Sequence, residues 1–571
     1  MKNSKLFSGP KGRTRRETLT ALAFVSPALI LIFTFSLFPV VFALYVSLHK
    51  WLIIQGEFRG LRNYVTAIDN FAYLGGFAIG LGLLYLAYLQ LKKIKELVEP
   101  ESKSHYPFLL SGALFGVSAL FFLRWFFYQL PEFLDIAKKM RGLERTQDLF
   151  TGLLRDAFKA ETVYPHWLQF IAVFAAAILV SWVLNRIIKH KDGAQIQIAY
   201  SGFWLALISG VGLLGFIYQA VDKVYTESVE TGTDPGIWPQ LITITTGVLL
   251  LVVAWLLWKN SEKQKSNFIF VWRVIASLLL MIAATVLIIE IPTVVAAGDA
   301  DLWDGLRVTI FFSLGTVPIQ LTIALFLSVL LFQKMRGSEV FRIIYFLPYV
   351  PPAIATATVF RVIFSDRSSG PMNRVIGLFG IEPQLWLRET TGIFKILSES
   401  MGITDYPNSI MPDFFSPELT ELLGSYLNGP SQALAVVIML SIWTFVGYNV
   451  VIYLAGLGNI SVELIEAAEL DGANKWDVFR HITFPLLSPT TYFLSLIAVM
   501  GTFKAFNTIW ILRLRGASLG TTDTFSVVIF EEFFIKTRYG YASALSFVLF
   551  AIILILTVVN NRIQGSKVFY G

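Results

Sequence analysis

Residues 466–489 read EAAELDGANKWDVFRHITFPLLSP, and they connect two long apolar stretches, Ser431–Leu457 and Leu486–Leu512. The segment combines a run of helix-forming residues with a glycine, Gly472, and it ends close to a proline, Pro485. Glycine supplies the backbone freedom that a sharp turn after a helix needs. The pattern therefore predicts two short helices joined by a turn at Gly472, at the surface of a membrane.

The residues on either side of Gly472 define the two predicted helices. No glycine or proline interrupts Val462–Leu470, and Ser461 is a suitable N-cap for that helix. The second helix covers roughly Lys475–Ile482. Ala467 and Ala468 fall on one face of the first helix, where small side chains let another protein approach closely. The alternative is an ordinary amphipathic hairpin that only lies on the membrane surface.

Composition places the whole chain in a membrane. The chain has 571 residues, of which 55% are hydrophobic and 15% are charged, whereas soluble proteins carry about 25% charged residues. The formal charge of +7 comes from basic residues scattered over short loops, so we expect no nucleic-acid partner. There is no cysteine, which excludes disulfides and thiol chemistry, and five scattered histidines give no metal-binding spacing.

Twelve apolar stretches are long enough to cross a bilayer, which takes about 20 residues each. The first is preceded by several basic residues, but it is too long for a signal peptide, and we interpret it as a retained helix. The predicted spans are Leu19–Leu48, Phe71–Leu91, Pro107–Leu130, Trp167–Ile188, Ile196–Ala220, Trp238–Trp258, Phe268–Ile289, Leu306–Phe332, Ile343–Phe364, Ser431–Leu457, Leu486–Leu512 and Tyr541–Asn560.

Basic residues gather in alternate loops, which indicates the orientation of the chain because cytoplasmic loops are enriched in Lys and Arg. Of the opposite loops, 222–234 is acidic and 290–304 has no Lys or Arg, while 131–166 is mixed and does not discriminate. This pattern puts both termini and the 461–485 segment in the cytoplasm. The basic loop residues are Lys92, Lys93, Lys95, Lys103, Arg186, Lys189, Lys191, Lys259, Lys263, Lys265, Lys334, Arg336 and Arg342.

The 466–485 segment resembles the "EAA" loop of ABC importer permeases. In that loop EAA is followed by three residues, Gly, nine residues, Ile, one residue and Leu-Pro, and only the Leu is replaced here, by Phe484. The first span with FRGLRNY, the segment FRIIYFLPYVPPAIATATVFRVI and the last two spans are similar to the same family. The resemblance covers 18–67 and 302–571, and it is closest to carbohydrate-uptake permeases of the maltose or maltodextrin large-subunit type.

This resemblance implies a set of partners and a coupling site. The partners are a second permease subunit, two cytoplasmic ABC ATPase subunits, an extracytoplasmic solute-binding protein and a sugar, in a bacterial or archaeal inner membrane. It implies no cofactor in this chain, because the ATPase subunits use the ATP. The residues that it assigns to ATPase coupling are Glu466, Ala467, Ala468, Asp471, Gly472 and Ala473.

Polar residues inside two late spans are candidates for the solute path, because such residues are costly in a membrane and tend to face a cavity. Tyr448 matches a position that relatives use for substrate, whereas Ala505 departs from a polar position, which puts maltose in doubt but not sugar in general. For each polar residue the alternative is a hydrogen bond between helices. The candidates are Thr444, Tyr448, Asn449, Thr502, Phe503 and Asn507.

Two regions depart from the family pattern. Residues 70–300 hold six additional spans between segments that adjoin in relatives, so we expect an inserted module between 1–69 and a permease core, 301–571. The external loop 365–430 is longer than usual, and prolines and glycines in it predict a small cap or short helices. Two interpretations are open: the loop contacts the binding protein, or it is a longer loop without a function of its own.

The sequence offers no catalytic constellation. The stretch nearest to a phosphate-binding loop, 9–14, lacks the GK[S/T] order, and there is no GxSxG motif. We therefore expect an all-α permease of about 12 spans that is not an enzyme. The alternatives are a permease of the same kind for a polyol, glycerol phosphate or oligosaccharide, and a secondary transporter or intramembrane enzyme built from the additional spans.

Overall fold

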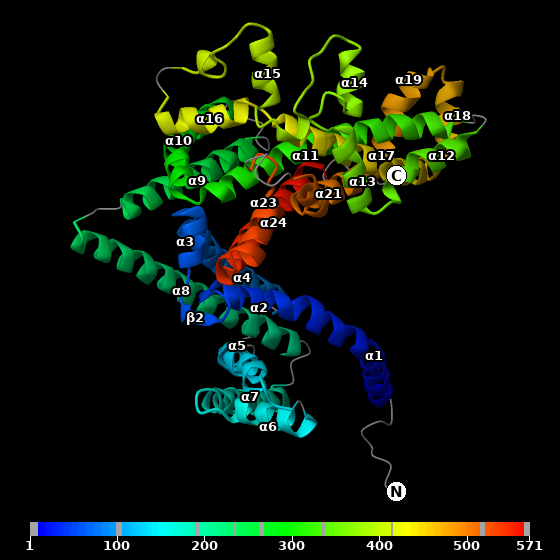
Figure 1. The fold of residues 1–571 in the computed structure, drawn as a ribbon. Coiled ribbons are helices and arrows are strands. Elements are labelled where there is room, and N and C mark those ends of the chain that lie inside the picture. The colour runs from blue at the N-terminus through cyan, green and yellow to red at the C-terminus, as the bar shows by residue number, and fades with distance from the viewer. Residues whose placement is uncertain are drawn as a thin grey trace. The chain divides into compact units, whose positions relative to one another are not determined.

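The computed structural model describes residues 10–98, 106–144, 146–188, 193–232, 236–261, 268–333, 337–412, 415–513 and 520–564. The regular structure of these described residues is helical apart from one antiparallel hairpin of β1 (His49–Trp51) and β2 (Gln55–Phe58) (Figure 1). The chain divides into two compact units, Met1–Asp69 with Ala284–Gly571, and Asn70–Ala283. Several loop residues that indicate orientation, among them Lys103, Lys189, Lys191, Lys263, Lys265, Lys334 and Arg336, lie outside the described residues.

The first unit contains the helices whose sequences resemble those of the permease family. Its membrane-length helices alternate with short surface helices, and α10 is shared with the second unit. Its main helices are α1 (Pro10–Ile32), α2 (Phe38–Ser47), α3 (Arg62–Ile68), α10 (Phe268–Ala297), α11 (Ala300–Phe332), α12 (Ser338–Phe346), α13 (Ala353–Ile363), α17 (Gln432–Gly458), α21 (Ser488–Phe503), α22 (Asn507–Leu512), α23 (Phe525–Phe530) and α24 (Tyr539–Gln564).

The predicted spans are confirmed in number, but two of them are broken. Ten described helices are long and apolar enough to cross a membrane, and two bent pairs bring the number to as many as twelve. Ser338–Tyr349 and Ala353–Ile363 meet at 89°, around Pro351 and Pro352. Proline lacks a backbone donor and disfavours a helical residue before it, so the pair of prolines explains this bend. The all-α fold class is confirmed.

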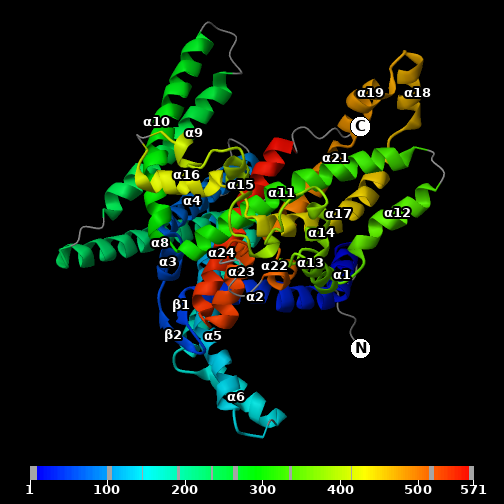
Figure 2. The same cartoon turned by 45° about the horizontal axis from the view of Figure 1, so that its top comes forward.

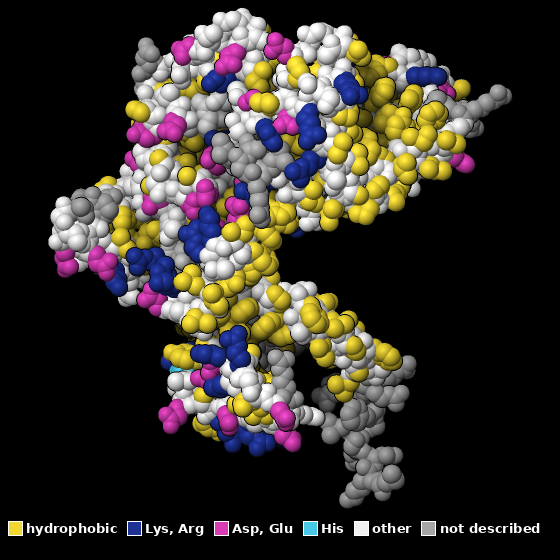
Figure 3. Space-filling model, in the orientation of Figure 1, with side chains coloured by type: hydrophobic (Ala, Val, Ile, Leu, Met, Phe, Trp, Pro, Cys, Tyr) yellow, Lys and Arg dark blue, Asp and Glu magenta, His cyan; other side chains and the backbone are white. Residues whose placement is uncertain are grey.

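Apolar side chains cover the exterior of the first helix pair. Phe24 on α1 is 82% exposed and Phe35, between α1 and α2, is 74% exposed. The hydrophobic side chains of this segment form a continuous yellow surface in Figure 3. A surface of this kind is stable only against lipid or another apolar helix.

The core of the first unit forms where α11 and α17 pack against each other. Buried residues of both helices, such as Phe312 and Leu434, share one apolar cluster with residues of the short helices α22 and α23. Gly447 lets α17 approach α12, because a Cβ atom at this position would collide with the carbonyl oxygen of Tyr345. Small residues allow such close approaches between helices in a membrane.

The N-terminal part of the first unit packs against α24, the last helix. The side-chain amide of Asn63 donates hydrogen bonds to the carbonyl oxygens of Ser47, at 2.7 Å, and His49, at 3.0 Å. A Cβ atom at Gly540 would collide with the His49 carbonyl, so the start of α24 needs a glycine there. The first and last spans are therefore neighbours in the fold.

The second unit is a helical bundle that extends over residues 70–283. A Cβ atom at Gly112 of α5 would lie 2.9 Å from the backbone carbon of Tyr200 on α8, which shows how closely the helices approach. Gln197 of α8 joins two further helices, because it donates to Ser111 at 2.6 Å and accepts from Ser181 at 2.9 Å. Its helices are α4 (Phe71–Leu97), α5 (Phe108–Lys139), α6 (Gln147–Lys159), α7 (Tyr164–Ile187), α8 (Gly193–Glu230), α9 (Ile237–Ser261) and the first part of α10.

The loop 365–430 contains the short helices that its sequence predicts. Asn373 organises its first half: its amide donates to Ser365 and Gln384 carbonyls, and its oxygen accepts from the Trp386 indole at 2.7 Å. The loop also carries a 3-10 turn at Asn408–Ile410. Its remaining elements are α14 (Pro371–Gly377), a 3-10 turn at Trp386–Arg388, α15 (Ile393–Ser400) and α16 (Pro417–Leu427).

Candidate coupling loop and solute path

The segment between α17 and α21 folds into the predicted pair of short helices. The first, α18, covers Val462–Leu470, and the second begins with α19 (Lys475–Val478). Gly472 between them has a φ of +86°, a left-handed conformation that costs other residues about 1–2 kcal/mol. The turn therefore depends on this glycine.

The second helical segment continues from Lys475 to Leu486, beyond the predicted end near Ile482. It also has an N-terminal cap that the sequence analysis did not predict. The Asn474 side chain accepts hydrogen bonds from the backbone N–H groups of Trp476 and Asp477, and the Asp477 carboxylate accepts from the Asn474 N–H. The signal in the sequence is an Asn followed three residues later by an acidic residue. Ser461 is the N-cap of α18, as the sequence predicts, although its side chain makes no capping hydrogen bond.

The hairpin of α18 and α19 projects from the other helices of the first unit, as the orange ribbon of Figure 2 shows. No residue of α18 is buried, and Leu470 is 89% exposed. Trp476 on α19 is 64% exposed. Exposed apolar side chains of this size, beside polar ones, mark a surface for another protein.

The residues assigned to coupling all lie on this hairpin. Glu466, Ala467, Asp471 and Gly472 are exposed, while Ala468 and Ala473 are half-buried. In the described part of the chain, no ion pair joins Glu463, Glu466 or Glu469 to a basic side chain. The hairpin thus presents small side chains together with unpaired negative charge.

The hairpin continues into α21 through a bend. A π-helical turn, Phe479–Thr483, and α20 (Phe484–Leu486) lead to Leu487, which is completely buried. The helical segments before and after this point meet at 59°. The buried residue Leu487 therefore joins the hairpin to α21 without an intervening loop.

Two hydrogen bonds tie α21 to its neighbours. The Tyr453 hydroxyl on α17 donates to the Thr491 hydroxyl at 3.2 Å, and the Thr502 hydroxyl donates to the Ser313 hydroxyl of α11 at 2.9 Å. Thr502 is buried. This geometry favours the alternative that the sequence left open for Thr502, a hydrogen bond between helices.

The other candidates for the solute path differ in their surroundings. The Tyr448 ring is half-buried and stacks on Tyr349 with ring centres 5.0 Å apart. Thr444 donates to the Leu440 carbonyl of its own helix, at 2.8 Å. Phe503 is buried in an apolar cluster, and Asn507 is exposed at the start of α22. The structure leaves Tyr448 available to a solute and gives Phe503 a packing role.

Asn449 belongs to a set of buried polar atoms that have no hydrogen-bond partner in the described part of the chain. Its side-chain nitrogen, the Gln320 side-chain oxygen and the Thr316 hydroxyl are all in this set. They lie on α17 and α11, the two helices that pack together. Buried polar atoms are normally paired, so these three are the best candidates for contacts with a polar solute. Gln320 and Thr316 are not among the residues that the sequence analysis assigns to the solute path.

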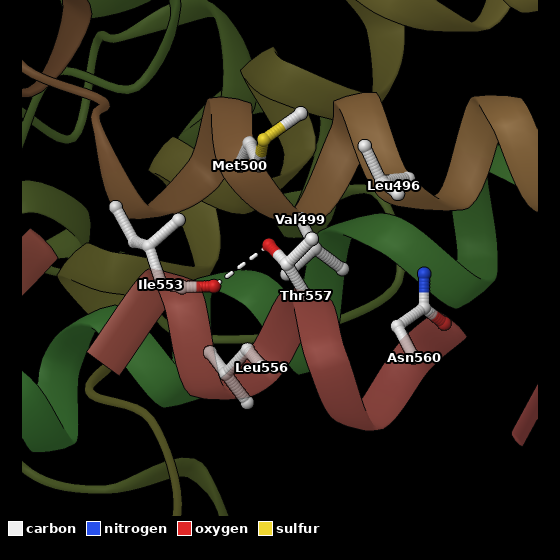
Figure 4. Close-up of a pocket in the computed structure, with 7 residues that line it drawn as sticks. All are labelled: Leu496, Val499, Met500, Ile553, Leu556, Thr557 and Asn560. Atoms are coloured by element: carbon white, nitrogen blue, oxygen red, sulfur yellow. Dashed lines mark hydrogen bonds between the residues drawn. The ribbon is translucent and has the colours of Figure 1, made fainter. Parts of the chain in front are cut away.

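A small cavity between α21 and α24 does not serve as a solute path. Its volume is about 10 Å³, enough for about one water molecule. It is lined mainly by apolar side chains, and the Thr557 hydroxyl beside it is already bonded to the Ile553 carbonyl at 2.7 Å (Figure 4). A sugar would not fit in it.

The segment between α22 and α24 carries charges that sequence reasoning did not pair. Arg513 Nε lies 3.0 Å from Asp523 Oδ1, and Arg513 also bonds Glu531. Glu532 is completely buried and accepts hydrogen bonds from Lys536 and Arg538. Burial raises the pKa of Asp523 to about 6, although the Arg513 guanidinium acts in the opposite direction.

Comparison with known proteins agrees with this arrangement. Residues 320–566 match the family described as "Binding-protein-dependent transport system inner membrane component". A probable ABC transporter permease of Pyrococcus horikoshii is 30% identical over 46% of this chain and 75% of its own length. The arabinooligosaccharides transport system permease AraP of Bacillus subtilis is 26% identical, over 46% and 71% respectively. The sn-glycerol-3-phosphate transport system permease UgpA of Agrobacterium fabrum is 28% identical, over 48% and 79%.

The matched residues include α17, the hairpin of α18 and α19, and α21, so the similarity covers both the hairpin and the helices on either side of it. The chain is a multi-pass membrane protein with as many as twelve spans. It belongs to the family of binding-protein-dependent transport system inner membrane components.

Proposed function

We propose that this chain is a permease subunit of an ATP-driven sugar importer, in which the α18–α19 hairpin receives force from a cytoplasmic ATPase. The observation that carries the proposal is the exposed hairpin with its left-handed turn at Gly472. Exposed apolar side chains such as Leu470 and Trp476, beside unpaired negative charge, favour a protein that covers the hairpin over a lipid surface. The membership of the permease family supports an ATPase as that protein.

The force would follow the bonded path through the first unit. Movement of α19 displaces α21 through the buried residue Leu487. The hydrogen bond from Thr502 to Ser313 then couples α21 to α11. Because α11 and α17 pack together, their buried polar atoms would be exposed and covered alternately as the helices move. This is alternate access by helix displacement.

A sugar suits the polar groups between these helices. Sugars bind through several hydrogen bonds and through contact of their carbon–hydrogen face with an aromatic ring, and Asn449, Gln320 and Tyr448 offer both. AraP supports an oligosaccharide as the solute, while UgpA favours glycerol phosphate as a second candidate. Both candidates need the same coupling hairpin.

The assembly and its orientation are part of the proposal. We infer a complex with a second permease subunit, two ABC ATPase subunits and an extracytoplasmic binding protein, in a bacterial or archaeal inner membrane. Both termini and the hairpin would lie in the cytoplasm, as the distribution of basic loop residues favours. This chain would hold no cofactor and catalyse no reaction of its own.

Uptake by the reconstituted complex tests the proposal. The full chain is purified with its partner subunits, placed in proteoliposomes with enclosed ATP, and supplied with binding protein and a panel of radiolabelled sugars outside. We expect uptake that requires ATP and persists when an ionophore abolishes ion gradients. Uptake that needs a proton or sodium gradient but no ATP would instead establish a secondary transporter.

A further inference from the structure

A polar cavity of about 260 Å³ lies in the first unit, at the end of α17 opposite to the coupling hairpin. Four segments contribute to it: the start of α11 with Arg307 and Phe311, the loop 365–430 with Lys395 and Asn428, the N-terminal end of α17 with its N-cap Ser431, and Thr521. Its volume is slightly below the range of about 300–1,000 Å³ that is typical of small-ligand pockets. It has room for one sugar unit and not for a chain of several.

The walls of the cavity are fixed by backbone contacts. Gly392 and Ser431 form an isolated antiparallel bridge, and the Ile393 N–H donates to the Pro430 carbonyl at 2.9 Å. A Cβ atom at Gly392 would collide with the Asn428 carbonyl, so the two segments approach as closely as a glycine allows. A ligand would therefore meet a preformed site, which reduces the ordering cost of binding.

The lining of the cavity is cationic. It includes Arg307 and Lys395 and no acidic residue. Arg307 lies 2.9 Å from Asp304, but that carboxylate is 57% exposed, and exposed ion pairs are worth only about 0–1 kcal/mol. The Lys395 ammonium has no hydrogen bond or ion pair with any described residue. Both cations are thus available to an anionic ligand.

The remaining groups suit a sugar ring that carries the anion. The Asn428 side-chain oxygen is buried, has no partner among the described residues, and can accept from a ligand hydroxyl. The Phe311 ring, held against Tyr426 with ring centres 5.9 Å apart, gives one wall an apolar face. An acidic side chain of a docked protein could reach the same cations, but a hollow of about 260 Å³ with an aromatic wall favours a small ligand over a flat protein surface.

The position of the cavity gives it a place in transport. The helix α17 has 27 residues, which corresponds to roughly 40 Å, so its two ends lie on opposite sides of a membrane. The coupling hairpin follows one end and the cavity lies at the other. If the hairpin meets an ATPase in the cytoplasm, the cavity opens to the outside, where the solute arrives.

We propose that this cavity is an outer subsite for a sugar unit that bears an oxyanion, a carboxylate or a phosphate. The oxyanion binds between Arg307 and Lys395, and the guanidinium of Arg307 can form two parallel hydrogen bonds with it. Ring hydroxyls donate to the side-chain oxygen of Asn428. The proposal rests on the proposed importer function and adds a solute class to it.

The test measures binding of single sugars to the purified complex of the full chain with its partner subunits, in nanodiscs and without binding protein. Titrations at constant ionic strength compare glucuronate, glucose 6-phosphate and glucose. We expect at least one of the two anionic sugars to bind about tenfold or more tightly than glucose. The preferred one tells whether the site takes a carboxylate or a phosphate.

Substitutions of the two cations test whether the anionic sugar binds in the cavity. Lys395→Gln and Arg307→Gln should each weaken binding of the anionic sugar about tenfold, and Lys395→Arg should restore most of it. The matched control is Arg374→Gln, an exposed cation of α14 outside the cavity, which should change nothing. Equal binding of glucose and both anionic sugars, or an equal loss in the Arg374→Gln control, would overturn the proposal. So would variants that lose only their affinity for the binding protein, since the cavity would then be a protein-docking site.

Uptake assays separate this proposal from the importer function. If the wild-type complex takes up solute with ATP but the anionic sugars do not bind at the cavity, the subsite alone is refuted. If they bind there but no ATP-dependent uptake of any sugar occurs, the importer function is refuted and the cavity is a binding site of another kind of protein.

Discussion

The backbone N–H of Asp299 donates a hydrogen bond to the carbonyl oxygen of Ala67, 3.1 Å away. The chain therefore leaves the first unit and returns to it at nearly the same point. Residues 70–283 form a compact unit of their own, and the second half of α10, from Ala284, belongs to the first unit. This is the geometry of an insertion, and the compact unit ends at Ala283, before the boundary of 300 that the resemblance to permeases implies.

The insertion predicts that the permease core survives without the second unit. Joining Asp69 to Asp301 by a short Gly-Ser linker should give a six-span protein that still assembles with its partner subunits and carries solute. We expect lower thermal stability, because the deletion also removes the part of α10 that packs in the first unit. Co-purification and uptake measure the outcome. Normal assembly without any uptake would show that the second unit takes part in transport.

The parts of the fold that are encoded locally could be predicted from the sequence. The apolar spans follow from hydropathy, because a membrane demands about 20 apolar residues per crossing. The turn at Gly472 follows from residue type, because its φ of +86° favours glycine. The prolines at 351 and 352 could have indicated the 89° bend. Hydropathy alone predicted one continuous span there, because the residues on both sides of the bend are apolar.

The parts that depend on distant contacts could not be predicted. Nothing in the sequence around Thr502 tells that its hydroxyl meets Ser313, since the two residues come together only when α21 packs on α11. The pairing of Arg513 with Asp523 and the close approach of Ala67 to Asp299 are of the same kind. A single polar residue in a span is compatible with a solute contact and with a helix contact, and only the packing separates them.

The stacked pair of Tyr448 and Tyr349 predicts the effect of substitutions in the solute path. Tyr448→Ala should weaken solute binding by about 1–3 kcal/mol, which is roughly ten- to a hundredfold. Tyr448→Phe should lose less, because it keeps the aromatic face. Thr502→Val is the matched control and should affect stability more than affinity, since Thr502 bonds Ser313. Unchanged uptake kinetics in an assembled Tyr448→Ala complex would place the path elsewhere.

The buried carboxyl of Asp523 predicts a dependence of stability on pH. Burial raises its pKa to about 6 in the folded protein, above the ordinary value of 3.8. A carboxyl whose pKa is raised by folding stabilises the protein when protonated, so this contribution is complete below pH 3.8 and is lost as the pH rises through about 6. The loss is at most about 3 kcal/mol.

Thermal unfolding of the wild type and of Asp523→Asn checks this sign. The stability of the wild type relative to the variant should fall between about pH 4 and pH 7, because the amide has no proton to lose. The neighbouring charges of Arg513, Glu531 and Asp301 are present in both proteins and serve as the common background. A difference that is constant with pH, or that grows as the pH rises, would contradict the assignment.

Single cysteines can test the orientation cleanly, because the chain has no cysteine of its own. Cysteine at Lys475, on the coupling hairpin, should be shielded from an impermeant reagent added outside intact cells. Cysteine at Glu230 or Asp301 should be labelled. Permeabilised cells provide the control, since all three positions should then react. Labelling of the Lys475 position from outside would reverse the orientation and remove the hairpin from any ATPase.

The coupling loop predicts that two substitutions separate assembly from transport. Gly472→Val places a β-branched residue at a φ of +86°, which should distort the turn, whereas Gly472→Asn should be tolerated because Asn adopts the left-handed region more readily. Glu466→Lys reverses a charge on the exposed hairpin. Both disruptive variants should insert in the membrane normally, because neither residue is buried.

The most direct measurement is the ATP hydrolysis of the complex in proteoliposomes, with and without solute-loaded binding protein. We predict that the wild type and Gly472→Asn are stimulated, and that Gly472→Val and Glu466→Lys stay near the unstimulated rate and transport no solute. Full stimulation and full uptake in both disruptive variants would contradict the claim that this hairpin couples the permease to its ATPase.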